Sequence, residues 1–133
     1  MKNKGILYAV YGTLRKEQSN HYLLENKLGV DYIGHYVTKP KYTMFDINGG
    51  FPGVIPEGNT SITLEIYEID NKFIERRLDA LEGYYGKDND MYKKDIIQTP
   101  FGPCFIYFYN CDCFGLSEIE SGDWIDHKNI KHV

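Results

Sequence analysis

The sequence is short of positive charge and has no hydrophobic run that could cross a membrane. Its 15 lysines and arginines stand against 19 aspartates and glutamates, so the net charge is -4 and the pI is near 5.5. A basic surface for nucleic acid needs the opposite balance, and a membrane-spanning helix needs about 20 mostly apolar residues. We therefore expect that the protein binds no nucleic acid and does not associate with a membrane. Residues 1–5 precede an apolar stretch of strand length instead of a signal sequence, which predicts a cytoplasmic protein.

Cysteine is also scarce, and its positions give little support to a metal site or a disulfide framework. The three cysteines, Cys104, Cys111 and Cys113, are odd in number, which is typical of free thiols in a cytosolic chain. The segment from Cys111 to Cys113 offers metal ligands, but no second closely spaced Cys or His pair lies nearby. We therefore predict no metal site. The four histidines are dispersed, and no recognised motif places one beside a nucleophile, so a triad could form only by approach in space.

What the sequence does contain is enough apolar material for one domain rich in β-structure. With 133 residues, of which 42% are hydrophobic, the chain can bury a core without disulfides. Aromatic residues reach 15%, mainly because there are 12 tyrosines, and this favours strands. There is no repeat, no low-complexity tract and no linker long enough to separate two domains. We predict a single domain over 1–133, with its core at about 5–124 and a loose tail at 125–133.

The pattern of apolar residues predicts several strands and two helices. Strands are expected at 5–11, 30–37, 42–47, 62–67, 92–98 and 104–110. A short helix should begin at Ser19 or Asn20 and run through Leu24. The clearest helix follows Asp70, which we expect to cap it, and stops at Gly83, a residue that tolerates positive φ. Many strands with two helices predict the α+β class.

The first strand ends at Tyr11 and is followed by Gly12, Thr13 and Leu14. A Gly at the start of a loop lets the backbone approach a ligand closely. Consecutive amides in such a turn can converge on an anionic or carbonyl oxygen. Most Gly-Thr pairs after strands are only turns, so this signal needs a second segment to support it.

Glu82 stands just before Gly83, at the predicted C-terminal end of the long helix. The helix macrodipole is negative there, and burial against Tyr84 or Tyr92 would add to its effect, so the pKa of Glu82 should be raised. A raised pKa suits a general base that works near neutral pH. Most glutamates in a last helical turn are nevertheless solvated surface residues. Glu65 is a second carboxylate, and we expect it on the surface.

Together, the stretch from Tyr11 to Leu14 and the later segment Leu78-Asp79-Ala80-Leu81-Glu82-Gly83 resemble the gamma-glutamylcyclotransferase-like family. This family includes gamma-glutamylamine cyclotransferases and AIG2-like proteins. It carries a Y-G-[ST]-L loop and an L-D-x-x-E-G segment whose Glu is catalytic. Further similar stretches follow the family's order at 51–56, 65–70, 106–110 and 122–124. The resemblance covers roughly 5–124 and implies a small mixed β-barrel with about two helices packed outside.

The resemblance also implies an activity, namely the conversion of a gamma-glutamyl amine or amide to 5-oxoproline and a free amine. Glu82 would be the general acid and base, and neither a metal nor an organic cofactor would be needed. The substrate-binding residues implied by the match are Tyr11, Gly12, Thr13, Leu14 and Tyr107. One departure concerns the strand after Tyr92, where the family often has Arg two residues on and this chain has Lys93 and Lys94.

Two functions of other classes stay open beside the enzyme. One is a binding module that keeps the pocket and sequesters a small amide or anion without turnover. The other is an interaction protein that reuses the fold. Turnover of gamma-glutamyl compounds would distinguish the enzyme from both. The sequence determines neither the amine portion of the substrate nor the oligomeric state.

Overall fold

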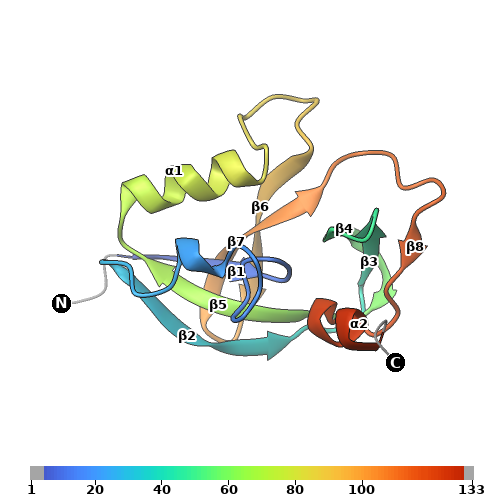
Figure 1. Ribbon diagram of the computed structural model, residues 1–133, viewed down its shortest axis with the longest axis horizontal. Helices are drawn as coiled ribbons and strands as arrows, with labels where there is room; N and C mark the ends of the chain where they lie inside the picture. Colours follow the sequence, from blue (N-terminus) through green and yellow to red (C-terminus); the bar gives the residue numbers. More distant parts are fainter. Residues whose placement is uncertain (1–4, 131–133) are drawn as a thin grey trace.

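The computed structural model describes residues 5–130, which form two β-sheets and two α-helices (Figure 1). The larger sheet has the strand order β2-β5-β1-β7-β6. In that order the strands are Val30–Val37, Thr63–Ile69, Ile6–Val10, Gly102–Tyr109 and Tyr92–Thr99. Neighbouring strands are antiparallel except β1 and β7, which are parallel. Because β1 is the central strand, the loop that follows it leaves from the middle of the sheet.

The smaller sheet has the order β4-β3-β8, with strands Phe51–Thr60, Tyr42–Ile47 and Ser117–Glu118. Its strand β4 lies close to β7, since a Cβ atom on Gly53 would come within 2.8 Å of the Tyr109 ring. Within residues 5–130 the two sheets do not join into one hydrogen-bonded barrel. The predicted α+β class is therefore confirmed, whereas closure of the barrel is not observed.

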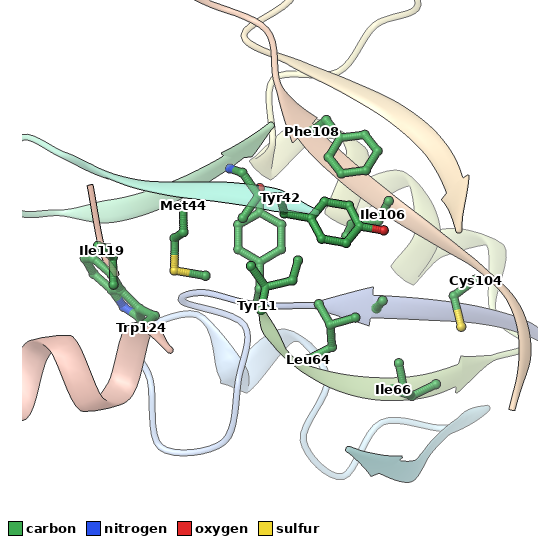
Figure 2. Close-up of a cluster of buried hydrophobic side chains, with 13 residues drawn as sticks. Tyr11, Tyr42, Met44, Leu64, Ile66, Cys104, Ile106, Phe108, Ile119 and Trp124 are labelled. Carbon is green, nitrogen blue, oxygen red and sulfur yellow. The ribbon is translucent and has the colours of Figure 1, made fainter. Parts of the chain in front are cut away.

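The larger apolar core lies between the two sheets (Figure 2). It includes Tyr11, Met44, Leu64, Ile106 and Trp124, all of which are buried. Full burial of an aliphatic side chain such as Leu64 stabilises the fold by roughly 1.5–3 kcal/mol. Strands from both sheets and the start of the last helix supply these side chains, so the core holds three separate parts of the chain together.

Helix α1 spans Lys72–Leu81 and covers one face of the larger sheet (Figure 1). Its buried residues Ile74 and Leu78 belong to a second apolar core beneath it. The N-cap is Asn71, whose side chain accepts a hydrogen bond from the amide of Ile74 at 3.2 Å. The prediction that Asp70 caps this helix was therefore wrong by one residue. The predicted stop is confirmed, because Gly83 has a φ of 68°.

The prediction of a loose tail after residue 124 was wrong for the residues described there. Trp124–Ile130 forms helix α2, and the rest of the predicted tail, 131–133, lies outside the described residues. Asp123 caps the helix, since its Oδ1 accepts from the amide of Ile125 at 3.0 Å. On the first turn, His127 Nε2 lies 2.7 Å from Asp46 Oδ2 on β3. Helix α2 is therefore fastened to the smaller sheet.

The helix predicted near Leu24 is a single 3-10 turn at His21–Leu23. Asn20 precedes it, as predicted, but its side chain makes no cap hydrogen bond and donates to Thr13 instead. Among the helices of residues 5–130, none has the length and apolarity that a membrane span requires.

Candidate active site

A pocket of about 300 Å³ opens between the loop after β1 and the end of α1. All six residues predicted to have a site role line it: Tyr11, Gly12, Thr13, Leu14, Glu82 and Tyr107. Asn20, Pro52, Met91 and Tyr92 line it too. The two segments that resemble a known family therefore meet at one cavity, although about 70 residues separate them. Their chemical roles stay predictions.

The loop of residues 11–14, called here the 11–14 loop, is held by bonds that leave its amides free. The carbonyl of Gly12 accepts from the Arg15 amide at 3.0 Å, and the carbonyl of Thr13 accepts from the Asn20 amide at 2.8 Å. The Asn20 side chain donates to Thr13 Oγ1 at 2.8 Å. Within residues 5–130, the amides of Gly12, Thr13 and Leu14 have no hydrogen-bond acceptor. The three residues line the pocket, so a ligand oxygen there is a candidate acceptor for these amides.

Gly12 is required by space and not by backbone conformation. Its φ is not positive, so the backbone conformation itself would tolerate other residues. A Cβ atom at Gly12 would instead lie 2.7 Å from Cγ and 2.8 Å from Cδ of Pro52. Pro52 is in turn fixed by Tyr92, whose hydroxyl donates to the Pro52 carbonyl at 2.8 Å. The glycine therefore allows β4 to form one wall of the pocket against the loop.

Arg15 anchors the far end of the loop through buried charges. Its Nε donates to Glu65 Oε2 at 3.0 Å, and its Nη1 donates to Asp123 Oδ1 at 2.9 Å. Glu65 is only 6% exposed and also accepts from the Lys16 amide and the Tyr67 hydroxyl. The predicted surface position of Glu65 was therefore wrong. Its carboxylate has three partners and does not line the pocket.

Glu82 is the C-cap residue of α1, and its backbone amide donates to the carbonyl of Leu78 at 3.0 Å. The residue is half-buried and lines the pocket. No group within residues 5–130 donates a hydrogen bond to that carboxyl group. Burial without a compensating partner raises the pKa of Glu82 to about 7.

Three tyrosines line the pocket, and each hydroxyl donates to the protein. Tyr11 donates to the carbonyl of Tyr107 at 2.6 Å, Tyr92 donates to Pro52, and Tyr107 donates to Asp79 Oδ1 at 2.5 Å. Burial raises the pKa of all three well above the usual tyrosine value, so they are neutral at pH 7. Among the lining residues, Glu82 is therefore the single group whose charge changes near neutral pH.

The cysteines take no part in this pocket. Cys104 is buried, Cys111 is exposed and Cys113 is half-buried, and all three are free thiols. Among the described residues there is no group of three or more His, Cys, Asp or Glu side chains that could hold a metal ion.

Comparisons with known proteins place this chain among relatives of similar length. Residues 8–126 match the family model "Gamma-glutamyl cyclotransferase, AIG2-like". The chain is 38% identical over 117 residues to the "Gamma-glutamylcyclotransferase family protein ytfP" of Citrobacter rodentium, covering 88% of this chain and 93% of that protein. It is 37% identical over 117 residues to the Escherichia coli K12 protein of the same name, covering 88% and 94%.

Solved structures agree with this placement. The solution structure of ytfP from Escherichia coli superposes with a TM-score of 0.70 at 34% identity, covering 92% of this chain and 98% of that one. The crystal structure of an aig2-like protein from Mus musculus has a TM-score of 0.68 at 24% identity, covering 90% and 88%, and this shows a shared fold. Because the family model spans most of the sequence, the chain belongs to the gamma-glutamyl cyclotransferase, AIG2-like family.

Proposed function

We propose that this protein is a lyase that converts a gamma-glutamyl amine or amide into 5-oxoproline and the free amine. The observation that supports this most directly is the pairing of Glu82 with the 11–14 loop across one pocket. Burial gives Glu82 a pKa of about 7, which suits proton transfer in both directions near neutral pH. Gly12, Thr13 and Leu14 lie in the same wall, and their free amides are the donors proposed to stabilise negative charge on a substrate oxygen.

The proposed reaction is intramolecular, so the pocket must mainly fold the substrate and move protons. Glu82 takes a proton from the α-ammonium group of the substrate, and the nitrogen lone pair attacks the side-chain amide carbonyl. A ring C–N bond forms and the carbonyl oxygen becomes an oxyanion, for which the loop amides are the donors. Glu82 then gives its proton to the leaving nitrogen, and the original amide C–N bond breaks.

The proton balance closes without a further reactant. The α-nitrogen loses two protons in becoming the lactam nitrogen, and the leaving nitrogen gains two in becoming an ammonium ion. Glu82 can carry these protons in turn and ends in the state in which it began. The neutral tyrosines Tyr11, Tyr92 and Tyr107 shape the cavity around this exchange.

The test is release of 5-oxoproline from a panel of gamma-glutamyl amines, gamma-glutamyl amino acids and glutamine. The wild type and Glu82→Gln should be compared at equal folded concentration. Turnover by the wild type that Glu82→Gln abolishes would support the proposal. No turnover by the wild type on any substrate would refute it and would favour a binding module that retains the pocket.

A further inference from the structure

Lys94 is enclosed beside the pocket without lining it. It lies on β6, and its side chain is only 12% exposed. Its Nζ lies 4.5 Å from the ring centre of Phe105 and 4.9 Å from that of Tyr8, with the rings of Tyr84 and Tyr107 at about 6 Å. An ammonium group enclosed in this way needs close partners, because burial of an unpaired charge is costly.

Lys94 finds those partners on two other elements. Its Nζ donates to Asp79 Oδ1 on α1 at 3.0 Å and to the hydroxyl of Tyr8 on β1 at 2.8 Å. The Tyr8 hydroxyl donates to Glu75 Oε1, also on α1, at 2.7 Å. Asp79 Oδ1 accepts in addition from the hydroxyl of Tyr107 on β7 at 2.5 Å. One ammonium group therefore connects four elements.

These four elements carry both sides of the pocket. Tyr8 precedes Tyr11 by three residues on the strand that leads into the 11–14 loop. Asp79 precedes Glu82 by three residues, which places the two about one turn apart on α1. Tyr107 lines the pocket, and its hydroxyl donates to Asp79.

We propose that Lys94 is a positioning residue for the pocket, which fixes the ring of Tyr107 and the last turn of α1 by holding the carboxylate of Asp79. The last turn carries Glu82 into the cavity, so a shift of this turn moves the reacting carboxyl group. The inference rests on the proposed lyase function for its kinetic consequences. Lys94 does not line the pocket, so it acts through Asp79 and not on the substrate.

Lys94→Met keeps the length of the side chain and removes its charge. Asp79 is then a carboxylate without its cation, and its 28% exposed side chain can turn to solvent and release the Tyr107 hydroxyl. At equal folded concentration, kcat should fall by about tenfold or more, because small misplacements of reacting groups cost rate. Lys94→Arg can still reach Asp79 and should retain most of kcat.

Lys93 supplies a matched control on the same strand. Its side chain is 41% exposed, and its nearest carboxylate is that of Asp88, which is fully exposed and 3.7 Å away. Lys93→Met therefore removes the same charge without touching the buried group, and kcat should stay at the wild-type value.

A second readout does not depend on turnover. The short hydrogen bond from Tyr107 to Asp79 should give a slowly exchanging, downfield hydroxyl proton in the NMR spectrum. Its absence in Tyr107→Phe assigns it. The signal should be lost or moved in Lys94→Met and kept in Lys94→Arg and Lys93→Met. If Lys94→Met fails to fold, Asp79→Asn tests the same ion pair by removing its negative charge. In this variant kcat should fall, although the Asn oxygen can still accept the hydrogen bond from Tyr107.

The outcomes separate this inference from the proposed function. An unchanged signal and an unchanged kcat in Lys94→Met would overturn the inference. The inference would also be overturned if Lys93→Met lost as much rate as Lys94→Met. It would be overturned too if the lower rate of Lys94→Met were fully explained by a smaller fraction of folded protein. If the wild type turns over no substrate, the proposed function fails, and the signal then decides the inference alone: persistence in Lys94→Met overturns it, and loss supports it.

Discussion

Replacing Glu82 by Gln should abolish activity without lowering stability, because the ionised carboxylate of Glu82 destabilises the folded state. The Gln side chain has nearly the same shape but cannot take the α-ammonium proton. Loss of a general base typically reduces the rate by ~10²–10⁴-fold. We therefore expect no measurable release of 5-oxoproline from Glu82→Gln, with binding of 5-oxoproline itself retained.

The expected stability change follows from the pKa of about 7, which is raised from 4.5 by burial. A carboxyl group with a raised pKa in the folded state costs stability only when it is ionised. The cost is absent below pH 4.5, grows between pH 4.5 and 7 and is constant above. Its upper limit is about 3 kcal/mol, which water in the half-buried site reduces. Glu82→Gln should therefore be more stable than the wild type at pH 8 and equally stable at pH 4.

The assay is urea unfolding of both proteins at pH 4 and pH 8, combined with release of 5-oxoproline at each pH. An exposed residue supplies the control, since Glu120→Gln removes the same charge away from the pocket. Wild-type turnover by Glu82→Gln, or an equal loss of stability at both pH values, would refute the role assigned to the ionised carboxylate. Equal loss at both pH values would mean that the substitution acts through packing, whatever the charge of the carboxyl group.

The remaining predictions concern pH and two neighbouring residues. Wild-type kcat/KM should fall about tenfold for each pH unit below 7, because only ionised Glu82 takes a proton; a flat profile from pH 5 to 8 would contradict this. Gly12→Val should abolish binding of 5-oxoproline, measured by calorimetry, and destabilise by about 1–3 kcal/mol, since its side chain meets Pro52. Arg15→Met should destabilise by about 3–5 kcal/mol in urea, because it leaves Glu65 buried without its cation; an effect below 1 kcal/mol would contradict it.

Sequence periodicity located most strands and the long helix because these are local properties. The strand at 92–98 and the alternation near Leu64 depend on neighbours two residues apart, and both are present as β6 and β5. The stop at Gly83 depends on one residue that tolerates positive φ. The predicted N-cap was wrong by one residue because Asp70 and Asn71 are adjacent and both residue types are good caps. Only the folded geometry decides between them.

The site was predictable in a different way. Nothing local connects Gly12 with Glu82, and their approach depends on the order β5-β1-β7 and on where α1 crosses that sheet. Family resemblance predicted the pairing because both segments match motifs of one family. The resemblance could not indicate why residue 12 must lack a Cβ atom. The reason is the close approach of Pro52, which exists only after β4 has packed against the loop.

Glu65 and Glu82 show that residue type alone does not decide whether a carboxylate is stabilised in its ionised form. Glu65 is buried and Glu82 is half-buried. Glu65 accepts hydrogen bonds from a guanidinium, an amide and a hydroxyl, whereas no group within residues 5–130 donates to Glu82. Partners favour the ionised form of a buried carboxylate and burial without partners disfavours it. Glu65 is therefore suited to hold Arg15 and the loop in place, and Glu82 to exchange protons. These partners come from distant parts of the chain, so this division of roles appears only in the folded protein.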